Sequence, residues 1–167
     1  MPANPDAKPI LVRALTAPDV PAFLGLIQAL ADYEKLPGPN TEACERLARD
    51  ALTEPPLFHV LLAELDGRVV GYGLYFFTYS TFLARPTLYV EDVFVLPEAR
   101  GNGVGRTIMK ALAREAARNE CGRMEWQVLH WNTTAMAFYE RLGAAPLDGW
   151  RPYRMTAEQF TRLAEQG

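Results

Sequence analysis

Two apolar runs joined by Asp66-Gly67 restrict the possible folds of this chain more than any other segment. Residues 59–65 and 68–78 are rich in branched and aromatic side chains, which strands favour. Asp and Gly tolerate the positive φ that a two-residue hairpin turn requires. A third strand-like run, residues 87–96, follows a loop over residues 79–86. The sequence therefore predicts a β-hairpin followed by a third strand in the middle of the chain.

The segments around these strands alternate between strand and helix patterns. Apolar residues at 3.6-residue spacing predict a helix that begins at Thr16, where Asp19 completes a short capping box, and a second helix that begins at Thr41. The other predicted elements are a strand over 9–15, a helix from the 101–105 loop to about 119, a strand over 124–129, a helix over 133–142, a strand over 150–155 and a last helix from about 157. The order β-α-α-β-β-β-α-β-α-β predicts an α/β (α+β) fold with one mixed sheet and helices on its faces.

Length and charge limit the classes of protein that fit. The 167 residues suit one domain over residues 9–167, preceded by a flexible tail over 1–8. The net charge of −3 argues against a nucleic-acid partner held by phosphate neutralisation. Apolar runs are too short to cross a membrane, and the first residues lack the pattern of a secretory signal, which predicts a cytoplasmic protein. Cys44 and Cys121 are predicted to be reduced, and no metal site is expected.

A glycine-rich loop, Arg100-Gly101-Asn102-Gly103-Val104-Gly105, lies between a predicted strand and a predicted helix. Alternate glycines allow a close approach to the backbone, and amides at a helix start bind phosphate. The loop is neither a Walker A motif nor a dinucleotide motif, because Arg106 stands where the third glycine belongs. It predicts a phosphate site, with an ordinary glycine turn as the alternative.

A cationic stripe follows this loop, because four basic residues repeat every four positions along the predicted helix: Arg106, Lys110, Arg114 and Arg118. The first members can attract a phosphate-rich ligand. The alternative is an ordinary solvated helix face.

Two adjacent carboxylates, Glu91 and Asp92, interrupt the apolar strand run. Successive side chains of a strand point to opposite faces, so at least one carboxylate must enter the packed layer or a cavity in it. A buried carboxylate needs a partner, a raised pKa or a functional pocket. An ion pair with a buried Arg is the structural alternative.

The segment over residues 131–144 combines helix punctuation with an aromatic pair. Asn132 or Thr133 can cap the start of the helix, and Gly143 can end it. Tyr139 follows Phe138, so its phenol is either a core group or a functional one.

Taken in order, these segments resemble the GNAT superfamily of acyl-CoA-dependent N-acetyltransferases, whose pyrophosphate-binding signature Arg/Gln-x-x-Gly-x-Gly/Ala is matched by Arg100, Gly103 and Gly105. Blocks at 33–36, 72–81, 88–95, 131–132 and 149–150 further resemble the diamine N-acetyltransferase family over about residues 9–155. That family contains spermidine/spermine acetyltransferases and a branch that acts on thialysine. Ser80 and Phe82 resemble the thialysine branch, since the polyamine branch has an acidic residue and a Trp there.

The resemblance implies acetyl-CoA as cofactor, a small-molecule amine as substrate and a homodimer. An amine like that of lysine, with a pKa of about 10.4, must lose a proton before it can attack a thioester. The resemblance assigns Glu91 as the proton acceptor, through a bound water, and Tyr139 as the proton donor to the CoA thiolate. It assigns cofactor contacts to Val93, Phe94, Val95, Arg100, Gly101, Asn102, Gly103, Val104, Gly105, Arg106, Asn132 and Tyr139. It assigns amine contacts to Tyr33, Glu34, Ser80, Phe82, Glu91, Asp92 and Trp150.

Three alternative functions are open at the level of sequence. A polyamine acetyltransferase differs in its preferred amine. A non-catalytic acyl-CoA-binding module keeps the glycine loop but does not need Glu91 and Tyr139, so the presence of both argues against it. Acetylation of protein N-termini or lysines is disfavoured by the crowded aromatic segment over residues 75–82, which predicts a narrow pocket.

Overall fold

The computed structural model describes residues 9–166 and divides into two compact units, Met1–Gln127 and Val128–Gly167, which are described here one at a time. The predicted flexible tail over residues 1–8 lies outside the described residues. None of the helices within residues 9–166 combines the length and apolarity that crossing a bilayer requires.

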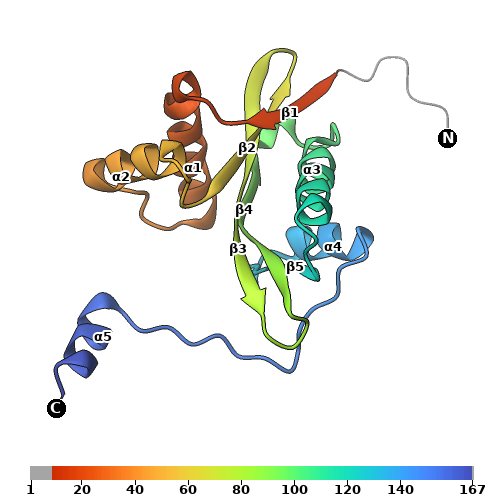
Figure 1. Ribbon diagram of the computed structural model, residues 1–167. Coiled ribbons are helices and arrows are strands. Elements are labelled where there is room, and N and C mark those ends of the chain that lie inside the picture. The colour runs from red at the N-terminus through yellow and green to blue at the C-terminus, as the bar shows by residue number, and fades with distance from the viewer. Residues whose placement is uncertain (1–8, 167) are drawn as a thin grey trace. The chain divides into compact units, whose positions relative to one another are not determined.

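The first unit is built on one mixed five-stranded sheet (Figure 1). The strands lie in chain order: β1 (Ile10–Ala14), β2 (His59–Leu65), β3 (Arg68–Ser80), β4 (Arg85–Val95) and β5 (Arg123–Trp126). Neighbours from β1 to β4 are antiparallel, whereas β5 runs parallel to β4. Asp66 and Gly67 have φ values of 53° and 73°, so the predicted hairpin turn and the predicted mixed sheet are confirmed.

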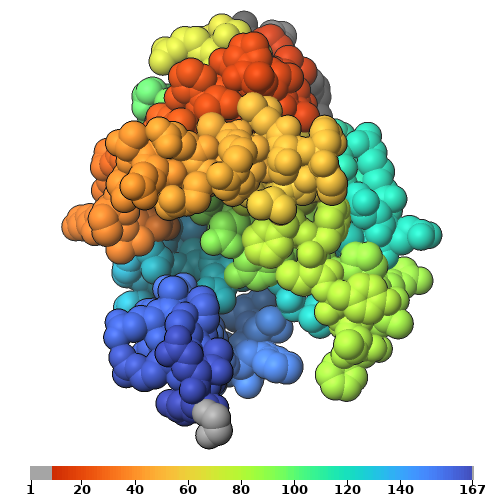
Figure 2. Space-filling view, turned by 60° about the vertical axis from the view of Figure 1, so that its left-hand side comes forward, coloured from red at the N-terminus to blue at the C-terminus, as the bar shows by residue number. Residues whose placement is uncertain are grey.

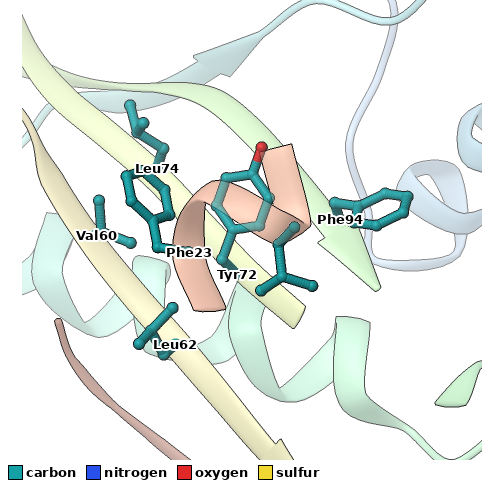
Figure 3. Packing of buried hydrophobic residues seen from close by; sticks show 7 residues of the cluster. Phe23, Val60, Leu62, Tyr72, Leu74 and Phe94 are labelled. Atoms are coloured by element: carbon teal, nitrogen blue, oxygen red, sulfur yellow. The ribbon is translucent and has the colours of Figure 1, made fainter. Parts of the chain in front are cut away.

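Helices α1 (Val20–Glu34) and α2 (Thr41–Leu52) lie on one side of the sheet (Figure 1). A 3₁₀ turn precedes α1, and there the Asp19 carboxylate accepts hydrogen bonds from the Thr16 amide at 2.9 Å and the Thr16 hydroxyl at 2.6 Å, as the capping pattern predicts. The core on this side centres on Phe23 of α1, which packs against apolar side chains of β2 and β3 (Figure 3). This core holds α1 over the middle of the sheet.

Helix α3 (Val104–Arg118) covers the opposite side of the sheet. It comes close to β3 because two alternate residues of that strand are Gly71 and Gly73. A Cβ at Gly73 would lie 2.8 Å from Cγ2 of Ile108, closer than real carbon atoms approach. These glycines therefore allow the close packing of α3 on β3.

Two boundaries in this unit differ from the prediction. The predicted loop over residues 79–86 is only a four-residue turn over 81–84, because Tyr79 pairs with Pro86 and Ser80 with Arg85 across the hairpin. Strand β5 ends at Trp126, three residues before the predicted end.

The second unit contains α4 (Thr133–Arg141) and α5 (Ala157–Ala164), near the predicted helices. The predicted strand over residues 150–155 is wrong: these residues are exposed and have no strand partner among the described residues. Alternating side chains can mark the faces of a strand, but a strand also needs a neighbour for its backbone hydrogen bonds, and Pro152 has no N–H to offer. Five strands are therefore present in residues 9–166.

Candidate active site

A β-bulge in β4 places the two adjacent carboxylates, Glu91 and Asp92, on the lining of one cavity. Leu74 pairs with Asp92 and Tyr75 pairs with Val90, so Glu91 is an extra residue in the ladder. In such a bulge two residues of one strand oppose one residue of the partner, and the regular alternation of side chains is lost. Glu91 and Asp92 consequently line one cavity instead of pointing to opposite faces. The strict alternation assumed from the sequence does not hold at this point.

The cavity has a volume of about 510 Å³ and lies on the α1–α2 side of the sheet. Its other walls are apolar side chains from α1, α2, the loop before β2, and β3: Ile27, Leu47, Leu57, Phe58, Leu74 and Phe76. An apolar wall with carboxylates in one part suits a small cation that carries a hydrocarbon chain.

Asp92 is partly buried, and its Oδ2 accepts a hydrogen bond from the Tyr72 hydroxyl at 3.1 Å. Burial raises the pKa of Asp92 to about 6, with further increases from the charges of Glu91 and Glu34, while the hydrogen bond from Tyr72 lowers it. Burial also raises the pKa of Glu34. Three of the residues predicted to bind the amine, Glu34, Glu91 and Asp92, therefore form one acidic group.

A structural ion pair does not account for these carboxylates. Within residues 9–166, no Lys or Arg forms a salt bridge with Glu91 or Asp92. The same part of the chain contains no group of three or more His, Cys, Asp or Glu side chains that could hold a metal ion. The negative charge is thus available to a cationic ligand.

The predicted phosphate loop has backbone geometry that depends on glycine. Gly101 and Gly103 have φ values of 81° and 84°, in the left-handed region. Nδ2 of Asn102 donates to the carbonyls of Ala99 at 3.1 Å and Arg100 at 3.3 Å, which fixes the turn.

The amides of this loop are open to an anion. Within the described residues, the amides of Gly101, Asn102 and Gly103 form no hydrogen bond to a backbone carbonyl, and the first amides of α3 have no partner inside the helix. A Cβ at Gly103 would meet only Cδ1 of Ile10, at 4.0 Å, so the space over the loop is clear. The loop therefore fits a diphosphate.

Arg100 ties this loop to the end of β4. Its Nε donates to the carbonyl of Val95 at 3.0 Å, and its guanidinium lies 4.6 Å from the centre of the Tyr33 ring. The Tyr33 and Phe94 rings pack at 6.3 Å. The structure thus brings these four predicted site residues together, and Tyr33 packs here instead of lining the cavity.

The cationic stripe on α3 is exposed and only partly paired. Arg118 forms a salt bridge to Glu115 at 2.6 Å, whereas Arg106 lies in the first turn of α3, beside the loop. The charge of Arg106 is therefore placed to attract the same anion as the loop amides.

The edge of β4 is open just past the bulge. Strand β5 pairs with β4 only over residues 87–90, up to Val90. Residues 91–95, including Val93, Phe94 and Val95, have β3 on one side and no described strand on the other. A ligand with amide groups can pair with this edge.

Ser80 and Phe82, predicted to contact the amine, lie where β3 ends and turns into β4. Figure 2 shows this part of the hairpin in yellow-green. The Ser80 side chain is buried and accepts a hydrogen bond from the Leu83 amide at 3.2 Å, while Phe82 is 98% exposed. Neither residue lines the cavity.

Three predicted site residues belong to the second unit. The Asn132 side chain caps α4 by accepting a hydrogen bond from the Ala135 amide at 3.1 Å. The Tyr139 ring lies 5.2 Å from that of Phe138, and Trp150 is 78% exposed.

Sequence reasoning missed Tyr72 and the apolar cavity walls. Tyr72 lies in a strand run that looks uniformly apolar, so its contact with Asp92 has no local signal. The one available signal is the Glu-Asp pair itself, since two carboxylates in a buried strand are unfavourable without a bulge or a polar partner.

A sheet edge that opens beside a glycine loop at a helix start is the arrangement expected of acyl-CoA-dependent N-acetyltransferases. Residues 25–144 match the acetyltransferase (GNAT) family, and the chain belongs to this family. The predicted superfamily and fold are confirmed.

Relatives and solved structures agree with this assignment. The chain is 39% identical over 166 residues to thialysine N-epsilon-acetyltransferase of Bos taurus, covering 93% of this chain and 97% of that protein. It is 31% identical to spermidine/spermine N(1)-acetyltransferase-like protein 1 of Homo sapiens, covering 92% of this chain but 23% of that protein. The structure of aminoglycoside N-acetyltransferase AAC(6')-Iy in complex with CoA is similar in fold, with a TM-score of 0.76 and 20% identity over 92% of this chain and 99% of that one.

Proposed function

We propose that this protein transfers an acetyl group from acetyl-CoA to a primary amine of a small molecule, with a thialysine-like amino acid or a diamine as the acceptor. The observation that carries the proposal is the position of Glu91 and Asp92, which line the cavity and are the first residues of the open edge of β4. An amine in the cavity would therefore lie beside the strand edge at which an acyl donor can bind.

The residues of the first unit fit the proposed donor. Acetyl-CoA, when bound, supplies an acetyl group that is activated as a thioester. The amides of Gly101 and Gly103 and those of the first turn of α3 would hold its diphosphate, with Arg106 adding positive charge. The open backbone of Val93 and the amide of Val95 would pair with its amide-containing arm, and the Val93 amide would polarise the thioester carbonyl.

The two carboxylates would bind the ammonium form of the amine and accept the proton that it must lose before it reacts. With a pKa of about 10.4, an alkyl amine is an ammonium ion near neutral pH. Asp92 would hold this cation, and Glu91, which is exposed, would accept one proton through a water.

Two further protons move during the transfer step: one leaves the amine nitrogen, and one is added to the sulfur of CoA. As the nitrogen–carbon bond forms and the carbon–sulfur bond breaks, the nitrogen releases its second proton to water. We assign Tyr139 as the donor that protonates the departing sulfur and then recovers a proton from solvent. A phenol, with an ordinary pKa of about 10, is suited to this exchange with a thiol of about 8.5.

The cavity favours an acceptor with one ammonium near the carboxylates and an apolar chain behind it. Its acidic groups are adjacent in sequence, and the remaining walls are apolar. An extended polyamine carries more ammonium groups than a diamine or an amino acid, and the apolar walls offer no further carboxylate for them. The bovine relative, whose name specifies thialysine, also supports this choice over the polyamine alternative.

The proposal also covers the domain organisation, the oligomeric state and the location of the protein. Residues 9–167 would act as one domain, since the family match over 25–144 crosses the boundary between the two units. The resemblance implies a homodimer, and we also propose a cytoplasmic location. Exposed aromatic side chains of the second unit, such as Trp150 and Tyr153, would be covered in a dimer, which sedimentation of the purified protein tests.

The function is tested by measuring thiol release from acetyl-CoA with thialysine, lysine, ornithine, spermidine and short diamines. We expect faster release with thialysine than with spermidine. A strong preference for spermidine would overturn the choice of branch. Binding of CoA without thiol release from any amine would favour the non-catalytic alternative, and no binding of CoA in calorimetry would refute the proposal.

A further inference from the structure

The hydroxyl of Tyr72 has no role in packing. Tyr72 is fully buried, and its ring meets that of Phe23 edge-on at 5.5 Å. Figure 3 shows its oxygen at the end of the ring that points away from Leu62. A Phe would fill the same space without a polar atom, and burying a hydroxyl is unfavourable unless it forms a hydrogen bond. The bond that this hydroxyl forms is the one to Asp92, at 3.1 Å.

Asp92 faces other acidic groups and no cation. The groups that affect its ionisation are Tyr72 from β3, Glu91 from β4 and Glu34 from α1. Two of these three are carboxylates, and within residues 9–166 no basic side chain pairs with Asp92. A cation that enters the cavity therefore meets a carboxylate whose orientation is set by one neutral donor.

We propose that Tyr72 is a positioning residue for the amine: its hydroxyl holds Oδ2 of Asp92, so that Oδ1 is left to bind the substrate ammonium. This inference rests on the acetyl-transfer function proposed above. It separates the roles of the two carboxylates, because Asp92 holds the cation and the exposed Glu91 passes its proton to water.

Loss of the Tyr72 hydroxyl should change the pKa of Asp92 and, with it, the binding of the amine. The hydroxyl donates to the ionised carboxylate and so lowers the pKa of Asp92, against burial and the charges of Glu91 and Glu34, which raise it to about 6. Loss of a hydrogen bond to a charged group should raise that pKa by about one unit. Less of the carboxylate is then ionised near neutral pH, and the amine binds more weakly.

The test compares Tyr72→Phe with Tyr75→Phe. Tyr75 is a matched control: it lies on the same strand, is 5% exposed, and stacks on His59 at 4.9 Å, away from Asp92. We expect the acidic limb of kcat/KM for the amine to move up by about one pH unit in Tyr72→Phe only, with KM for the amine raised several-fold at pH 6.5 and KM for acetyl-CoA unchanged.

A second measurement does not depend on turnover. Carbon-13 NMR titration of labelled aspartate carboxyls should show the same upward shift for Asp92 in Tyr72→Phe. In the Asp92→Asn background, Tyr72→Phe should cause little further loss of activity, because the group through which it acts is already gone.

The outcomes separate the two proposals. If the wild-type protein acetylates amines but the pH profiles and Asp92 titrations of Tyr72→Phe and Tyr75→Phe coincide, the positioning role is refuted and the acetyl-transfer function stands. If the wild-type protein acetylates no amine, the proposed function fails, and an unchanged Asp92 titration in Tyr72→Phe overturns the inference as well.

Discussion

Replacing Asp92 with Asn should stabilise the folded protein at neutral pH while it impairs amine acetylation. The pKa of Asp92 is raised from an ordinary value of 3.8 to about 6, first by burial and then by the charges of Glu91 and Glu34. The folded state therefore holds this proton to higher pH than the unfolded state does. Asp92 adds to stability below about pH 4, and this contribution is lost as the pH rises through about 6.

The size of the effect follows from the shift. About two pKa units at 1.36 kcal/mol each correspond to about 3 kcal/mol of unfavourable free energy once Asp92 is ionised. Asp92 keeps some contact with solvent, and the new amide must find its own partner. We therefore expect Asp92→Asn to recover about 1–2 kcal/mol at pH 7.

Urea unfolding at several values between pH 4 and pH 8, followed by circular dichroism, measures this difference. With an m value of about 2 kcal/mol/M, the midpoint of the variant should lie about 0.5–1 M above that of the wild type at pH 7 and approach it near pH 4. Glu125→Gln is a suitable control. Glu125 forms a partly exposed salt bridge with Arg123 at 3.0 Å, so its replacement should change the urea midpoint little. A variant that is less stable at pH 7, or a difference that does not vary with pH, would refute the reasoning.

Three other substitutions test the loop, the packing of α3 and the phenol. Gly103→Ala places a Cβ at φ 84° beside the phosphate site, so KM for acetyl-CoA should rise about tenfold in steady-state assays. The control Gly25→Ala, in helix α1, should leave this KM unchanged. Equal KM values for the two variants would show that the loop does not bind the cofactor. Gly73→Ala brings a Cβ to 2.8 Å from Ile108 and should lower the free energy of unfolding by about 1–3 kcal/mol in urea titrations, and an unchanged midpoint would contradict the close packing. Tyr139→Phe should lower kcat about 10²-fold with little change in CoA affinity by calorimetry, whereas unchanged turnover excludes Tyr139 as the proton donor.

The predictions that succeeded depend on signals carried by neighbouring residues. The β2–β3 hairpin follows from two apolar runs around Asp66-Gly67, and α2 follows from apolar residues at helical spacing after Thr41. The strand predicted over residues 150–155 failed because a strand depends on a partner elsewhere in the chain, about which its own residues carry no information.

The candidate site likewise has one part formed by neighbouring residues and one part formed by residues far apart in the chain. The phosphate loop is a local object, since its glycines, its turn and the helix it begins all lie within a few residues of Gly103. The cavity is not local, because Leu47 of α2, Phe76 of β3 and Asp92 of β4 meet only when the helices pack on the sheet.

Short-range chemistry in the amino-acid sequence thus determined the order of most elements, the glycine loop and the presence of two adjacent carboxylates. Tertiary structure alone decided that Glu91 and Asp92 share one cavity and that Asp92 meets the hydroxyl of Tyr72, 20 residues earlier in the chain. The physical reason is the bulge: its position depends on the register between β3 and β4, which is set by packing across both faces of the sheet.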